Sequence, residues 1–264
     1  MDENVPPLSA EESNSVDDPQ TRPLLTVLLA IVVGLAYLAV QILVVIGLLV
    51  LELTRNPNLD IDAWADQAVS NGTILSIATS LAALITVPLM IGFTALLVRR
   101  QQRSAPIRQF LLLRWPGAKS LAIWLSAVSI YVFAADWFML LSGHDMTAEF
   151  MIEAYRTADS VALLWVALLV AAPVTEELFF RGFLFRGLMS TRLRWWGAAI
   201  ITSLAWTLIH VQYNWQTMLV IFLGGLLLAA ARQSSQSVVT CILMHTVWNF
   251  VAMFQTMLIV GRGA

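Results

Sequence analysis

The sequence predicts an all-α fold, a polytopic transmembrane bundle of about seven helices. Hydrophobic residues make up 59% of the 264 residues and charged residues only 12%, whereas a soluble domain has roughly 25% charged residues. The apolar residues are gathered into successive long runs, and a helix needs about 20 of them to cross a bilayer. The single cysteine, Cys241, excludes a disulfide within the chain.

Seven apolar runs follow residue 22. The candidate spans are residues 24–51, 73–98, 120–141, 161–188, 196–213, 215–231 and 236–259. The first run is much longer than the apolar core of about 7–15 residues in a signal peptide, and the residues before it are acidic, so we expect a permanent helix. We expect residues 1–22 to form a polar, disordered tail and residues 23–264 to form one membrane domain.

The basic residues predict the orientation of the bundle. The densest basic stretch lies between the second and third runs and contains Arg99, Arg100, Arg103, Arg108, Arg114 and Lys119. Placing this stretch in the cytoplasm puts the N-terminus inside, and of the 15 basic residues only Arg55, Arg156 and Arg262 fall outside. No segment resembles a targeting signal, so we expect a prokaryotic cytoplasmic membrane. Within the basic loop, residues 104–118 are interpreted as an interfacial segment or an ordinary loop.

Ionisable residues inside apolar helices are costly and are therefore functional candidates. In the fourth run, Glu177 and Arg181 are four residues apart and share a helix face, so they are expected to pair. Glu176 is rotated by about 100° from Glu177, and an unpaired carboxylate can exchange a proton with a reactant. The alternative is that both acids reach the cytoplasmic interface beside Arg181. Pro173 is expected to kink this helix and free backbone groups.

Two of the three histidines lie in later apolar runs. His210 follows Trp206 by four residues, and His245 precedes Asn249 by four, so His245 and Asn249 share a helix face. Each histidine alone could simply bond neighbouring helices. As a set, a carboxylate and an imidazole can deprotonate a water, while a second imidazole and an amide can donate to a developing oxyanion.

Zinc is the competing cofactor hypothesis. Glu176, His210 and His245 are ligand types found in catalytic zinc sites, but the HExxH spacing is absent, so no metal is favoured. Counting residues from the predicted helix ends places the candidate side chains at depths in the membrane that differ by roughly 10 Å. Helix tilt, or a displacement of the fourth helix along the membrane normal, could close this gap.

The order Glu-Glu-x-x-x-Arg (residues 176–181), aromatic-x-x-x-His (206–210) and His-x-x-x-Asn (245–249) resembles the CAAX-prenyl-endopeptidase and bacteriocin-processing (CPBP, Abi) family of intramembrane proteases. The resemblance covers about residues 160–255. It implies that Glu176 activates water with help from His210, that His245 and Asn249 stabilise the oxyanion, and that Glu177 and Arg181 form a structural ion pair. The family usually has phenylalanine where this chain has Trp206.

The resemblance implies an endopeptidase acting on a membrane-associated peptide or lipidated protein, with a prenylated or a bacteriocin-like substrate as the alternatives. The expected partners are this substrate and the lipid bilayer, and no nucleic acid is expected. Two other classes remain open: a proton-coupled transporter and a non-catalytic immunity or scaffold protein of the same fold. Asp136 is interpreted as an acid near the outer interface or an accessory site residue. His144 and Asp145 are expected in a solvated loop, and Cys241 as a helix-packing residue.

Overall fold

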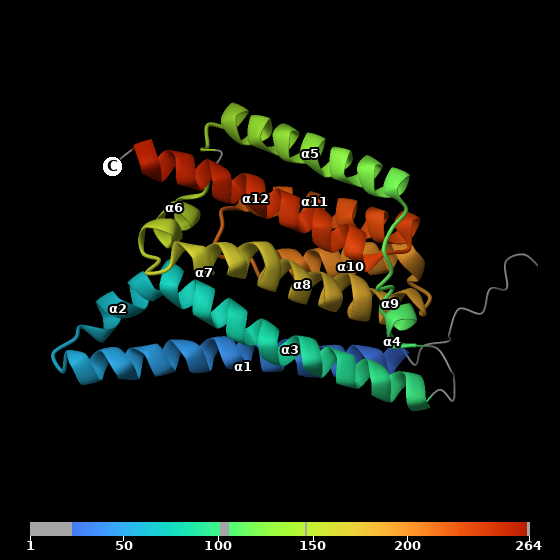
Figure 1. The fold of residues 1–264 in the computed structure, drawn as a ribbon, viewed down its shortest axis with the longest axis horizontal. Coiled ribbons are helices and arrows are strands. Elements are labelled where there is room, and N and C mark those ends of the chain that lie inside the picture. Colours follow the sequence, from blue (N-terminus) through green and yellow to red (C-terminus); the bar gives the residue numbers. More distant parts are fainter. Residues whose placement is uncertain (1–22, 101–105, 146, 263–264) are drawn as a thin grey trace, which may run out of the picture.

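The computed structural model describes residues 23–100, 106–145 and 147–262, with the side chains of Pro23 and Arg100 left out. The polar tail predicted at 1–22 and Arg103 of the basic loop lie outside the described residues. Within them the regular structure is entirely helical, as predicted (Figure 1). Six helices are long and apolar enough to cross a membrane, and the chain is an integral membrane protein.

Five of these six helices are regular: α1 (Pro23–Arg55), α3 (Gly72–Arg100), α5 (Ala118–Leu141), α11 (Trp215–Ser235) and α12 (Val238–Arg262). The other is a continuous helix over 161–189 that alternates between α and π geometry. Its segments are α7 (Val161–Val166), η2 (Ala167–Ala171), α8 (Ala172–Glu177), η3 (Leu178–Leu184) and α9 (Phe185–Met189). Single turns of π-helix are often found at functional sites, and two of them flank Glu176 and Glu177 here.

The fifth predicted span, 196–213, differs from the structure. Helix α10 (Arg194–Leu208) has 15 residues and is therefore about 22 Å long, shorter than the hydrocarbon core of about 30 Å. It ends because residues 209–214 form a turn, and Asn214 then caps α11 by accepting a 2.9 Å hydrogen bond from the Thr217 amide. The chain still reverses between α10 and α11, but His210 lies in this turn and not in a helix.

Three short helices lie at the ends of the bundle: α2 (Ile61–Ala68), α4 (Ile107–Phe110) and α6 (Glu149–Arg156). Figure 1 places α4 and α9 at one end, and α2, α6 and the C-terminus at the other. Arg108 and Arg186 therefore lie toward the first end, whereas the acidic residues of α2 and α6 lie at the second. This separation of charge agrees with the predicted alternation of the helices.

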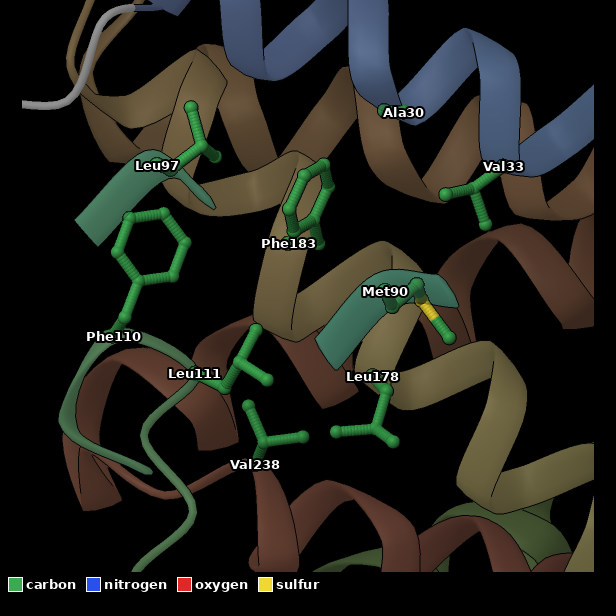
Figure 2. Close-up of a cluster of buried hydrophobic side chains, with 9 residues drawn as sticks. All are labelled: Ala30, Val33, Met90, Leu97, Phe110, Leu111, Leu178, Phe183 and Val238. Atoms are coloured by element: carbon green, nitrogen blue, oxygen red, sulfur yellow. The ribbon is translucent and has the colours of Figure 1, made fainter. Parts of the chain in front are cut away.

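A core cluster of buried side chains joins five parts of the chain near the α4 end (Figure 2). Its members are Ala30, Val33, Met90, Leu97, Phe110, Leu111, Leu178, Phe183 and Val238. Phe110 and Leu111 are 1% and 0% exposed, so these two residues of the segment 104–118 enter the core, whereas Trp115 is 73% exposed. Arg186 fixes Phe110 in the core by donating to its carbonyl at 2.9 Å.

Candidate active site

A cavity of about 960 Å³ lies among α1, α5, α8, α11, α12 and the turn after α10. Glu176, His210, His245 and Asn249 all line it, so the structure brings together the four residues to which the sequence assigned chemistry. Glu176 and His245 are 8% and 4% exposed. The remaining wall is largely apolar, and α1 contributes Ala30, Gly34 and Leu38 to it.

Behind this wall lies a buried charge network. Arg181 Nη1 is 3.0 Å from Glu177 Oε1, and His245 Nδ1 is 3.0 Å from the same oxygen. Arg181 and Glu177 are both 0% exposed and do not contribute to the cavity lining. The ion pair expected from the i,i+4 spacing is therefore present, and it also fixes one nitrogen of His245.

Asn249 is held by the π-helical segment η2. The Ala172 amide donates to the Ala167 carbonyl, five residues back, and Pro173 has no amide hydrogen to donate. The Leu168 carbonyl, whose intrahelical donor would be residue 172 or 173, instead accepts a 2.7 Å hydrogen bond from Asn249 Nδ2. Pro173 thus does free a backbone group, as expected, and α12 supplies its partner.

Thr246 repeats this contact one turn earlier on α12. Its hydroxyl donates to the Leu169 carbonyl at 2.9 Å. Leu169 is four residues before Pro173, so its normal α-helical donor is missing. The two bonds join α12 to η2.

Trp206 is the site residue whose role the sequence did not reveal. Its indole Nε1 donates to Glu176 Oε2 at 2.5 Å, and its backbone carbonyl lies 2.8 Å from His210 Nδ1. The Trp206 ring also lies 5.3 Å from the His210 ring, measured between centroids. One side chain therefore contacts both Glu176 and His210, which lies in the turn just past the end of α10.

Among the described residues, no three His, Cys, Asp or Glu side chains are grouped to hold a metal ion. The set of Glu176, His210 and His245 is therefore not assembled as a three-ligand site in this conformation. Cys241 is fully buried, and its thiol contacts the Leu228 carbonyl at 3.3 Å, as expected for a helix-packing residue.

Two further acids, Asp136 and Asp145, also line the cavity. Asp136 lines it and accepts a 2.7 Å hydrogen bond from Gln255 Nε2, so it is part of the cavity wall. Asp145 also lines the cavity, whereas the adjacent His144 has its Nε2 3.1 Å from Gln216 Nε2. The loop expected to be merely solvated therefore borders the cavity.

Fold and site together define a polytopic membrane protein with acidic and imidazole side chains gathered around an intramembrane cavity. Residues 158–251 match the model of a protease family described as type II CAAX prenyl endopeptidase Rce1-like. This match confirms the resemblance to the CPBP family over the segment that carries all three motifs.

An uncharacterized 24.3 kDa protein of Escherichia coli is 33% identical to this chain over 93 residues, which are 34% of this chain and 42% of that protein. The chain thus covers less than half the length of this relative. No solved structure gives a significant match.

Proposed function

We propose that this protein is an intramembrane endopeptidase that hydrolyses a peptide bond with a water activated by Glu176. The observation that carries the proposal is that two adjacent carboxylates have different surroundings. Glu177 is neutralised by Arg181 outside the cavity, whereas Glu176 faces the cavity with no ion pair among the described residues. The family match over 158–251 supports the same reaction class.

In the proposed reaction, Glu176 accepts a proton from water as the water oxygen attacks the carbonyl carbon of the substrate. The C–N bond then breaks, and the proton held by Glu176 passes to the leaving nitrogen. The products are a carboxylic acid and an amine, with no cofactor consumed. His210, in the turn beside Trp206, assists in orienting the water.

His245 and Asn249 are proposed to stabilise the oxyanion that forms during attack. With Nδ1 donating to Glu177 Oε1, Nε2 can donate to the oxyanion only when the ring carries both protons. Asn249 Nδ2 carries a second hydrogen beyond the one given to Leu168, and this hydrogen is available to the substrate.

The substrate is proposed to be a membrane-associated peptide or lipidated protein. The cavity reaches α1, where Val27, Ile31 and Leu35 line it with apolar side chains, so an apolar segment or lipid chain of the substrate has a surface to bind. The site is proposed to work in a prokaryotic cytoplasmic membrane, with the α4 end of the bundle and the N-terminus in the cytoplasm.

The test is a comparison of protein termini in the membranes of cells that carry wild type or Glu176→Gln at equal expression. New peptide ends that depend on Glu176 are expected with wild type only. Glu149→Gln is the matched control, because Glu149 is exposed on α6 and outside the cavity lining. Equal termini with wild type and Glu176→Gln, with both proteins folded and inserted, would refute the proposal and leave the transporter and scaffold classes.

A further inference from the structure

Trp206 contacts four of the polar side chains in and behind the candidate site. Besides the indole bond to Glu176 Oε2, its ring lies 5.3 Å from the rings of both His210 and His245, measured between centroids. The guanidinium of Arg181 lies 4.6 Å from its ring centroid. The residue is 2% exposed, so it is a fixed part of the interior and not a mobile wall.

We propose that Trp206 is the positioning residue for Glu176: its indole N–H holds Oε2 and thereby leaves Oε1 as the oxygen that takes the proton from water. The inference rests on the proposed function and adds a residue to it. Phenylalanine, which is usual at this position in the family that the sequence resembles, has an aromatic ring but no hydrogen-bond donor. This chain therefore fixes its carboxylate with a contact that phenylalanine cannot make.

The surroundings of Trp206 hold the donor in one place. A methyl group at Gly225 would lie 2.9 Å from Ser203 Cβ and 3.2 Å from Trp206 Cε3, so α11 approaches the ring closely because residue 225 has no side chain. On α10, Ala199, Ser203 and Trp206 lie on the buried face. Two small residues thus precede the indole and let α10 and α11 come together.

Arg181 makes the indole a better donor. A cation over the face of an aromatic ring is attracted by its π electrons and polarises the ring, and hydrogen bonds in a low-dielectric interior strengthen when a neighbour polarises them. The guanidinium is itself held by Glu177 at 3.0 Å. Glu177 and Arg181 therefore act on Glu176 through Trp206, although neither lines the cavity.

The test removes the donor and keeps the ring. Trp206→Phe, and replacement of Trp206 with the sulfur analogue 3-benzothienylalanine, both lack the N–H, and the analogue keeps the bicyclic shape. On a peptide that spans a cleavage site found by the comparison of termini, kcat is expected to fall by about tenfold to hundredfold, as for the loss of one hydrogen bond to a charged group. KM is expected to stay within about twofold, because the bond orients the carboxylate and does not bind substrate.

Trp124→Phe is the matched control. The Trp124 indole also donates a hydrogen bond, to Ser234 Oγ at 2.9 Å, but the residue does not line the cavity. Its substitution is expected to leave kcat and KM unchanged. Full kcat in both Trp206 variants, with the control also active, would overturn the proposal.

A second measurement does not depend on activity. In protein labelled with ¹⁵N at the indoles, the Trp206 resonance is identified by its loss in Trp206→Phe, and Glu176→Ala is expected to shift it more than any other indole resonance. An unshifted Trp206 resonance would overturn the inference. If wild type cleaves nothing, the proposed function fails, and the indole resonance still decides whether Trp206 holds Glu176.

Discussion

Replacing Arg181 with methionine removes the positive partner of a carboxylate that has no exposed surface. The structure gives Arg181 a 3.0 Å ion pair with Glu177 at 0% exposure of both side chains and a 3.3 Å hydrogen bond to the Gly225 carbonyl. Breaking a buried pair from one side leaves an uncompensated charge, which costs about 3–5 kcal/mol. We expect Arg181→Met to lower the free energy of unfolding by that amount.

Removing both charges is expected to cost less than removing one. In Glu177→Gln/Arg181→Met the stranded carboxylate is gone, so the loss should be smaller than for Arg181→Met alone. Residues in contact couple by about 0.5–3 kcal/mol, and the difference is expected on that scale. Equilibrium unfolding in mixed detergent and SDS micelles measures both variants. The double variant is expected to be inactive, because His245 Nδ1 has lost the carboxylate that fixes it.

The chain supplies an exposed pair as the control. Arg55 and Glu52 are 3.8 Å apart with side chains 67% and 40% exposed, and exposed pairs contribute only about 0–1 kcal/mol. Arg55→Met is therefore expected to change stability by less than about 0.5 kcal/mol. If Arg55→Met and Arg181→Met cost the same, or if the double variant is as unstable as the single one, the reasoning about Glu177 and Arg181 is refuted.

Three further predictions concern helix packing, the freed carbonyls and metal. Gly224→Ala places a Cβ 2.1 Å from the Trp248 ring and should lower the free energy of unfolding by about 1–3 kcal/mol. In the control Gly92→Ala the new Cβ has nothing within 4 Å, so the midpoint of thermal unfolding should stay the same or rise slightly. Thr246→Val removes the side-chain donor to the Leu169 carbonyl and should lower the free energy of unfolding by about 1 kcal/mol without abolishing cleavage. Asn249→Leu should lower stability and also abolish cleavage. Equal activity of the two variants would contradict the assigned role of Asn249. Treatment with a zinc chelator should leave cleavage unchanged if water is activated by Glu176 alone, and inhibition reversed by added zinc would support the metal mechanism instead.

The residues of the fourth helix illustrate how much the sequence could predict. The pairing of Glu177 with Arg181 follows from their i,i+4 spacing alone, because a helix inside a membrane fixes which side chains share a face. The effect of Pro173 was also predictable, since proline always removes a donor. The partners of the freed carbonyls were not, because Thr246 and Asn249 reach them from a helix about 80 residues further along the chain.

The role of Trp206 shows why the rest of the site could not be predicted from the sequence. The sequence identifies an aromatic residue four positions before His210, but an indole N–H is catalytically relevant only if a carboxylate lies within hydrogen-bonding distance. That distance depends on how closely α10 approaches α8, and hence on Gly225 and Ser203 where α11 meets α10. No spacing within one helix encodes it.

The sequence by itself determined that the chain crosses a membrane as helices, because hydrocarbon requires every backbone group to be satisfied within its own segment and the apolar runs have the necessary length. It also determined the order of the polar groups and the pairing of Glu177 with Arg181. Only the tertiary structure decided that α10 is too short to span, that Glu176 and not Glu177 faces the cavity, and that Trp206 holds it. All three depend on contacts between helices. Close packing at small residues and hydrogen bonds to freed carbonyls set the depth and rotation of each helix, and local periodicity does not.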